Sequence, residues 1–325
     1  MENKVIIITA PTATGKTSLG ISIARRFNGE IISADSRQVY KGLDIGTGKD
    51  LADYSSGGGP NVIYHLIDIV SPMREYNLKE FYMDANKKIK EIIDKQRLPI
   101  IVGGTALYID SLISSYKFPI APPNQTLREN IEHKSSEEIA DFLKNNYPEE
   151  YEKIDLKKSK PRLTRALEKV LNTKNINADK IYDKNDYLII GTYFPRLEVH
   201  DRIEKRLDQR LSHGMIEEVK HLHDNGVTWE RLDRFGLEYR YISLYLQKEI
   251  SFEEMRSTLF ARIRILARRQ DIWFRKIENS GHKIHWLKKG NCEQAFSLVE
   301  KFLNNETLPD PEIRLSSIHY GKKTQ

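Results

Sequence analysis

Residues 10–17 read APTATGKT and carry the groups that bind phosphate in a glycine-rich loop. In the pattern G-x-x-x-x-G-K-[ST], backbone amides surround phosphate oxygens at a helix N-terminus, the lysine neutralises charge, and the last hydroxyl reaches Mg²⁺. Ala10 stands in place of the first glycine. The residues expected to bind phosphate are Ala10, Pro11, Thr12, Ala13, Thr14, Gly15, Lys16 and Thr17, and Thr17 is the expected magnesium ligand.

A carboxylate, Asp35, ends the apolar stretch EIISADS at 30–36. In an ordinary ATPase or kinase, an apolar strand ending in an acid would hold the water shell of the metal. The stretch IIVGGT at 100–105 ends in glycines and a threonine instead. Asp35 is therefore a candidate general base or hydrogen-bond acceptor, and the alternative is that it caps the next helix.

Apolar runs alternate with helical patterns along the first hundred residues, which is typical of a parallel sheet flanked by helices. The sequence predicts an α/β fold of the P-loop NTPase type, with the loop, Asp35 and the GGT turn at the carboxyl ends of strands, where such sheets bind ligands. Strands are expected at 4–10, 30–36, 98–105, 187–193 and, at an edge, 283–287. Helices are expected at 17–27, 81–96, 197–225, 236–247 and 251–277.

Residues 116–186 interrupt this pattern. The segment begins with the proline-rich FPIAPP, shows no convincing strand, and has helical patterns around 126–146 and 161–172. We interpret it as an inserted all-helical domain. The expected domains are therefore 1–115 (first part of the core), 116–186 (the insert) and 187–325 (second part of the core), with a polar tail at 309–325 that is expected to be mobile.

Positive charge is concentrated in two windows of a chain whose formal net charge is +6. Residues 157–174 contain seven Lys or Arg and one acid, and residues 256–276 again contain seven and one. Such runs are usually solvated helix faces, but two of them on a chain with a phosphate loop also fit a polyanionic partner. The single cysteine, Cys292, excludes an internal disulfide, and the histidines lack metal-site spacing. Without an apolar run long enough for a membrane span or a signal peptide, the expected location is the cytoplasm.

Several motifs occur together and in a specific order. The chain closely resembles the tRNA dimethylallyltransferase (isopentenyltransferase) family over most of residues 4–277. The motifs that carry the resemblance are APTATGKT, EIISADSRQVYKGLDIGTGK, HLIDIVSP, PIIVGGTALYIDSL, RALE, DRIEKRLDQRL and RRQDIWFRK. The pair DSRQVYKGLDIGT and VGGTxLY is highly specific.

The resemblance implies transfer of a dimethylallyl group from dimethylallyl diphosphate to the exocyclic amine of the tRNA adenine that is 3′-adjacent to the anticodon. The loop would then hold the diphosphate, aided by Arg202, with Mg²⁺ near Thr17. Asp35 would accept the proton of the amine, and Thr105 would position adenine and donor. The chemistry agrees, since a leaving diphosphate needs its growing negative charge stabilised.

The resemblance also implies contacts with tRNA, in which the insert embraces the anticodon stem-loop and the adenine is flipped out. The residues matching the tRNA-contacting positions are Asp35, Ser36, Arg37, Gln38, Thr105, Lys158, Ser159, Lys160, Pro161, Arg162 and Arg165. The chain departs from the family at Ala10, at Ala106, where a methyl would lie near the substrate channel, and at KSKPR (158–162). One site appears within one chain, so a monomer is expected.

Three alternatives remain open from the residues alone. A prenyltransferase acting on free AMP or ATP would not need the basic insert. A P-loop kinase for small molecules is suggested only by the loop. A non-catalytic RNA-binding protein is disfavoured because Lys16, Thr17, Asp35 and Thr105 are all present.

Overall fold

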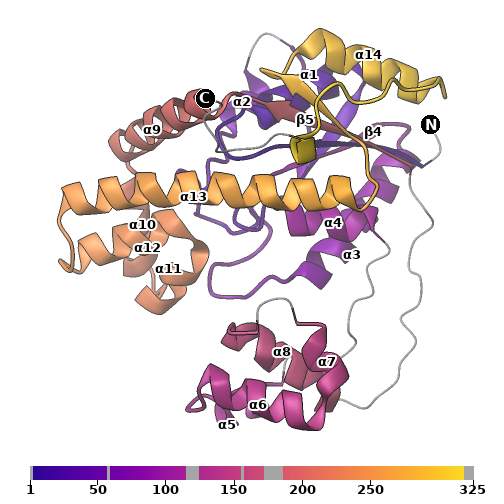
Figure 1. Cartoon of the computed structure of the whole chain (residues 1–325). Helices are drawn as coiled ribbons and strands as arrows, with labels where there is room; N and C mark the ends of the chain where they lie inside the picture. Colours follow the sequence, from indigo (N-terminus) through magenta and orange to yellow (C-terminus); the bar gives the residue numbers. More distant parts are fainter. Residues whose placement is uncertain (1–2, 57–58, 115–123, 155–156, 172–185, 318–325) are drawn as a thin grey trace, which may run out of the picture. The chain divides into compact units, whose positions relative to one another are not determined.

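The computed structural model describes residues 3–56, 59–114, 124–154, 157–171 and 186–317. Its centre is a six-stranded parallel sheet with the strand order β3-β2-β4-β1-β5-β6 (Figure 1). The strands are β1 (Lys4–Thr9), β2 (Gly29–Ser33), β3 (Tyr64–His65), β4 (Leu98–Gly103), β5 (Asp186–Tyr193) and β6 (Ile284–Lys288). The expected parallel α/β sheet is confirmed, including β6 at an edge.

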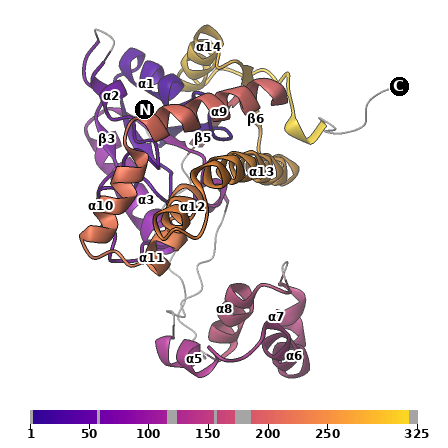
Figure 2. The same cartoon turned by 90° about the vertical axis from the view of Figure 1, so that its left-hand side faces the viewer.

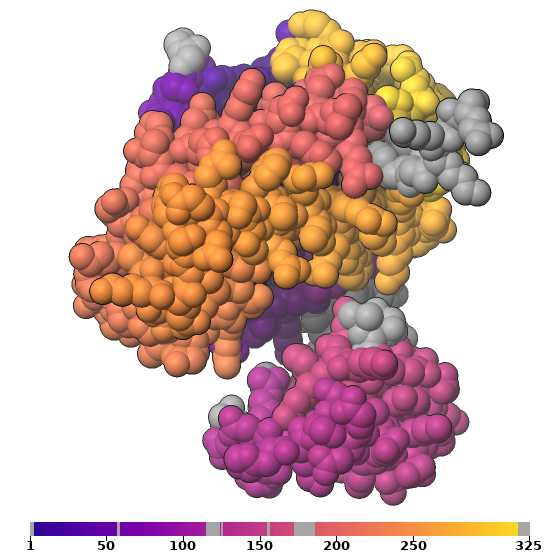
Figure 3. Space-filling model, turned by 60° about the vertical axis from the view of Figure 1, so that its left-hand side comes forward, coloured from indigo at the N-terminus to yellow at the C-terminus, as the bar shows by residue number. Residues whose placement is uncertain are grey.

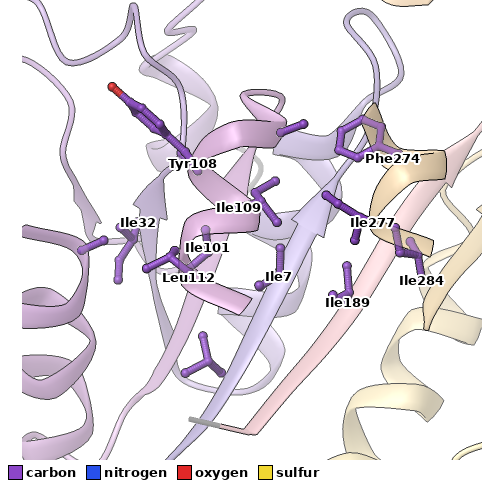
Figure 4. Close-up of a cluster of buried hydrophobic side chains, with 14 of the residues drawn as sticks. Ile7, Ile32, Ile101, Tyr108, Ile109, Leu112, Ile189, Phe274, Ile277 and Ile284 are labelled. Carbon is purple, nitrogen blue, oxygen red and sulfur yellow. The ribbon is translucent and has the colours of Figure 1, made fainter. Parts of the chain in front are cut away.

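Both faces of the sheet are covered by helices, because the strands alternate apolar side chains between two cores. Val5 and Ile7 of β1 belong to one core, and Ile6 and Ile8 belong to the other. The first core contains side chains of α3 (Leu78–Asp94), α4 (Ala106–Ile113) and α13 (Phe252–Asn279), and Figure 4 shows Ile109, Phe274 and Ile277 lying over Ile7. The second contains side chains of α1 (Lys16–Arg26) and α14 (Cys292–Leu303).

A helical region beside the carboxyl ends of the strands has its own core, which joins apolar side chains of α9 to α13 with Val39, Tyr40 and Leu43 (Figure 2). The helices before α13 are α9 (Arg196–Ser212), α10 (Met215–Asp224), α11 (Trp229–Phe235) and α12 (Leu237–Leu246). The helix expected at 197–225 is in fact two, because Gly214 takes the left-handed conformation at a φ of 96° and starts α10 in a new direction.

Some elements had not been predicted, and one expectation was wrong in part. Helix α14 and the short elements β3 and α2 (Ala52–Ser55) had not been predicted. The tail was expected to be mobile from residue 309, but Leu315 is buried and the Glu278 carboxylate accepts hydrogen bonds from the amides of Leu315 and Ser316, at 3.1 and 2.8 Å. Leu315 and Ile313 pack against the first core and Glu278 accepts the two hydrogen bonds, so these few contacts fix the segment despite its polar composition. Residues 318–325 lie outside the described part of the chain.

The chain divides into two compact units, residues 1–115 with 184–325, and residues 116–183 (Figure 3). The smaller unit contains α5 (Gln125–Asn130), α6 (Ser136–Asn146), α7 (Pro148–Glu152) and α8 (Lys160–Leu171). These helices bury their own core, which includes Ile139, Leu143, Leu163 and Leu167. The FPIAPP segment, Lys174 and the expected boundary at 115/116 lie outside the described residues. Among the described helices, none is long and apolar enough to cross a membrane.

Candidate active site

The loop between β1 and α1 has the geometry of an anion-binding turn. Gly15 precedes α1 with a φ of 79°, a conformation that favours glycine, and the helix begins at Lys16. The amides of the first turn of α1 therefore have no acceptor within the helix, and the helix dipole favours negative charge there. Ala10 is buried, and its φ angle is not in the left-handed region. The backbone at this position therefore accommodates a Cβ. Inside the loop, the Thr14 hydroxyl donates to the Pro11 carbonyl at 2.8 Å.

The ammonium of Lys16 lies in a crowded, positively charged environment. Burial and the nearby Arg206 lower the pKa of Lys16 to about 8, although Asp35 acts in the opposite direction. A Cβ placed on Gly104 would be only 3.5 Å from Lys16 Cε, so the loop and the GGT turn are neighbours. An anion at this position would therefore meet the lysine, the helix N-terminus and the end of β4 together.

Three arginines of α9, Arg202, Arg206 and Arg210, face the loops at the edge of the sheet. Arg202 Nε donates to the Ala13 carbonyl at 2.6 Å, and Arg206 donates to the Thr12 hydroxyl. Burial and Arg210 lower the pKa of Arg206 to about 9. Arg206 and Arg210 had not been assigned a role from the sequence, but their spacing of four residues places all three on one helix face.

Gln270 of α13 links the phosphate loop to the GGT turn, and its role had also been missed. Its Oε1 accepts from the Thr12 amide at 3.0 Å, and its Nε2 donates to the Gly104 carbonyl at 2.9 Å. The residue lies in RRQDIWFRK, one of the motifs of the resemblance, which was the available signal. Through this one amide group, the two loops are held at a fixed separation.

Asp35 and Thr105 lie on adjacent turns that follow β2 and β4. Asp35 Oδ1 accepts from the amides of Arg37 at 2.9 Å and Gln38 at 3.4 Å, and Thr105 Oγ1 accepts from the Ser36 amide at 3.1 Å. Asp35 thus caps a turn and not the helix that the alternative expected, and Oδ2 has no protein partner among the described residues. The turns are in direct contact, since a Cβ on Gly103 would be 2.1 Å from the Ala34 carbonyl oxygen.

The remaining residues of the ADSRQ segment differ in their surroundings. Gln38 accepts from the Ser33 hydroxyl and donates to the Gly48 carbonyl, both at 2.9 Å, so its amide is engaged in holding the loop. Ser36 and Arg37 are partly exposed beside Asp35. Ala106 is the first residue of α4, directly after Thr105, and its side chain packs in the first core.

Residues 44–48 form a loop against the helical region. The Glu218 carboxylate of α10 accepts from the amides of Asp44, Ile45 and Gly46 at 2.6–3.0 Å and from the Tyr239 hydroxyl at 2.7 Å. This loop also meets α9, because Arg210 donates to the Gly46 carbonyl at 3.3 Å. Glu218 therefore fixes the loop that meets the α9 arginines.

The KSKPR segment lies in the smaller unit, at the start of α8. Lys158, Pro161 and Arg162 are exposed, whereas Ser159 and Lys160 are partly buried. Lys160 donates to the Glu132 carbonyl at 2.6 Å, and Arg165 pairs with buried Glu168 at 2.8 Å. Arg165 therefore stabilises the small unit, whichever ligand this unit binds.

Among the described residues, no group of three or more His, Cys, Asp or Glu side chains could hold a metal ion. Thr17, in the first turn of α1, is partly exposed. This donor set fits Mg²⁺ only if phosphate oxygens and water complete its shell, as is usual for this ion.

Comparisons with known proteins show the family of the chain. A family model described as "IPP transferase" matches residues 38–277, and one described as "Isopentenyl transferase" matches residues 3–57. A "tRNA dimethylallyltransferase 1" of Geotalea uraniireducens is 41% identical over 288 residues, 89% of this chain and 93% of the relative. A "tRNA dimethylallyltransferase 2" of Shewanella sediminis is 44% identical over 285 residues, covering 87% and 93%.

Two solved structures are similar over 94% of this chain. A tRNA isopentenylpyrophosphate transferase from Bacillus halodurans has a TM-score of 0.68 and 29% identity, with 96% of that chain covered. A eukaryotic dimethylallyltransferase described as acting on tRNA has a TM-score of 0.79 and 25% identity, with 81% covered. A model matching most of the chain, together with relatives above 40% identity, leads to one conclusion: the chain belongs to the IPP transferase family.

Proposed function

We propose that this enzyme transfers the dimethylallyl group of dimethylallyl diphosphate to N6 of the adenine that is 3′-adjacent to the anticodon in tRNA. The carbon–oxygen bond to the diphosphate breaks, a carbon–nitrogen bond to N6 forms, and the amine loses a proton. The observation that carries the proposal is the juxtaposition of a cationic anion-binding loop with the Asp35–Thr105 turns.

The loop side of the site would bind and stabilise the leaving diphosphate. Amides of residues 12–17, Lys16, Arg202 and Arg206 present positive charge where negative charge grows as the bond breaks. We propose Thr17 as the residue that holds Mg²⁺, which would supply further neutralisation of the diphosphate when bound. The remainder of the metal shell would come from the substrate and water.

The turn side would orient the adenine. Asp35 Oδ1 is occupied by the turn amides, so Oδ2 is the atom proposed to accept the N6 proton. Thr105, whose hydroxyl oxygen already accepts from the Ser36 amide, would use its O–H to position the reactants. Ser36 and Arg37 would contact the neighbouring nucleotides, whereas Gln38 would act by holding the loop.

The smaller unit would bind the anticodon stem-loop, with Lys158 and Arg162 as the phosphate contacts of its exposed surface. This feature favours tRNA over free AMP, which needs no extended basic surface. A kinase is disfavoured because β4 ends in Gly103 rather than in an acid. All the groups named come from one chain, which supports a monomer, and a tRNA substrate supports a cytoplasmic location.

The test is label transfer from dimethylallyl diphosphate, with Mg²⁺, to unmodified tRNA and to AMP in parallel. We expect label in tRNA alone, and label in AMP alone would refute the proposal. Asp35→Asn keeps an Oδ1 acceptor for the Arg37 amide and hence the turn. It should lower the transfer rate by about 10² or more with tRNA affinity nearly unchanged. An affinity loss equal to the rate loss would overturn the assignment of Asp35 as the base.

A further inference from the structure

A second hollow lies at the carboxyl end of the sheet, on the β5 side of the phosphate loop. Its walls come from β5, β6, α9 and α13, and its space, including the open mouth, is about 590 Å³ (Figure 1). In the sheet order, β5 and β6 lie on one side of β1, whereas β2 and β4, which lead to Asp35 and Thr105, lie on the other. The hollow is therefore separate from the reaction centre, although both adjoin the same loop. We call it the β5–β6 hollow, and its lining includes Phe194, Val199, Arg264, Arg268, Asp271 and Trp286.

The floor of the hollow is apolar and fixed. Trp286 of β6 lies against Gly191 of β5, where a Cβ would be only 2.3 Å from the indole ring. The indole Nε1 donates to the Glu278 carboxylate at 2.7 Å, so the polar edge of the ring is satisfied and the rest of its surface is apolar. Phe194 and Val199, both partly buried, extend this floor toward α9. The apolar body of a ligand would therefore meet a preformed surface.

The rim of the hollow is cationic. Arg264 and Arg268 are exposed side chains of α13, about one turn apart. Within the described residues, no acidic side chain pairs with either of them, whereas Arg256 on the same helix binds Asp208 at 2.7 Å. Burial raises the pKa of Asp271, the acid of the lining, to about 6, which indicates that water reaches this wall poorly. The hollow thus suits a small anion that has a compact apolar body.

Two contacts connect the hollow to the phosphate loop. Arg202, whose Nε donates to the Ala13 carbonyl at 2.6 Å, has its guanidinium carbon 4.6 Å from the centre of the Phe194 ring. The Thr192 hydroxyl donates to that of Thr14 at 2.9 Å, and Thr14 lines the hollow from the loop. An anion in the hollow would contact the ring that supports Arg202 and would add negative charge beside a loop that binds negative charge. Binding at the two places should therefore be mutually unfavourable.

We propose that the β5–β6 hollow binds a small amphiphilic anion, whose acidic group lies at Arg264 and Arg268 and whose apolar body lies against Phe194 and Trp286. This ligand weakens the binding of diphosphate at the loop. The inference goes beyond the proposed function, because it adds an inhibitory site that takes no part in the transfer. It depends on the binding of diphosphate by the loop and not on the identity of the prenyl acceptor. Since coupling between two sites is reciprocal, diphosphate weakens the ligand by the same factor.

A fluorescent anion tests whether the hollow binds such a ligand. The probe is anilinonaphthalene sulfonate (ANS), which reports apolar surfaces. We expect saturable binding of one ANS per chain, weakened on the order of tenfold in Arg264→Gln/Arg268→Gln. The matched control, Arg262→Gln/Arg269→Gln, removes two exposed charges of the same helix that do not line the hollow, and it should bind ANS as the wild type does. Val199→Phe fills the hollow without changing its charge and should also weaken ANS, while urea midpoints check that each variant is folded.

Inorganic diphosphate tests the coupling. At saturation it should lower the affinity of ANS by a finite factor, about fivefold or more, and ANS should lower the affinity of diphosphate by the same factor in calorimetry. A loss of ANS affinity that keeps growing with diphosphate concentration would show that both bind at the loop, and would overturn the proposal. Unchanged ANS affinity in both hollow variants, or no effect of diphosphate, would overturn it too. These measurements use neither tRNA nor AMP, so label transfer to AMP alone would refute the proposed function and leave this inference standing.

Discussion

Replacing Lys16 with methionine should stabilise the folded enzyme while it abolishes transfer. Burial and Arg206 lower the pKa of Lys16 from 10.5 to about 8, and no hydrogen bond to a described residue compensates for that burial. Below pH 8, Lys16 is charged in both the folded and the unfolded state. The folded state is therefore destabilised by the full free-energy equivalent of the pKa shift, about 3 kcal/mol. Methionine has a similar length and no charge, so we expect the free energy of unfolding to rise by about 2–3 kcal/mol at pH 7.

The sign of the pH dependence follows from the same pKa. Between pH 8 and 10.5 the unfolded chain binds more protons at Lys16 than the folded one, so the wild type gains stability as the pH rises. The advantage of Lys16→Met should therefore shrink over this window and vanish near its upper end. Urea denaturation followed by tryptophan fluorescence measures this, because Trp229, Trp273 and Trp286 all belong to the larger unit.

Two controls make the test decisive. Lys205→Met, at an exposed position of the same region on α9, should change the stability by less than about 0.5 kcal/mol. Inorganic diphosphate should raise the unfolding midpoint of the wild type but not that of Lys16→Met. If Lys16→Met proved less stable than the wild type at pH 7, the reasoning that the site bears an electrostatic cost would be refuted.

Two further changes test the positioning of the loops. Glu218→Gln should cost about 1–3 kcal/mol of stability and reduce transfer, because one carboxylate accepts from the amides of Asp44, Ile45 and Gly46. Retention of wild-type stability in urea would contradict this role. Gly103→Ala should destabilise the enzyme by at least about 2 kcal/mol, since its Cβ would lie 2.1 Å from a backbone oxygen. A soluble variant with an unchanged midpoint would show that these turns separate easily.

The central sheet could be predicted from the sequence because its signals are local. Each buried strand is a continuous apolar run, and the glycine at position 15 marks the start of α1 directly. The features that were not predicted have only weak local signals in the sequence. Strand β3 has only two residues, and the break at Gly214 lies within a helical pattern that continues on both sides. The fixed segment at 315–317 depends on Glu278, which lies far away in the sequence.

Only part of the candidate site could be predicted from the sequence, for a related reason. Lys16, Asp35 and Thr105 follow strands, so their common edge could be inferred from the order of elements. Arg206 and Gln270 reach the same loop from 194 and 258 residues farther along the chain. Their participation depends on how α9 and α13 pack, which spacing alone does not determine. Conversely, Arg165, expected at tRNA, is paired with Glu168 three residues farther along α8, and the burial of this acid depends on the packing of the helix.

The charge balance of the site connects its stability with its chemistry. Lys16 and Arg206 both have lowered pKa values because burial and neighbouring arginines disfavour their charged forms, while Asp35 and Asp50 offset this only in part. A protein designed for stability alone would not bring these cations together. In the proposed reaction, a diphosphate would relieve this repulsion when it binds, and would relieve more of it as its charge grows during bond breaking. The electrostatic cost of the free site would then be the source of its preference for the leaving group.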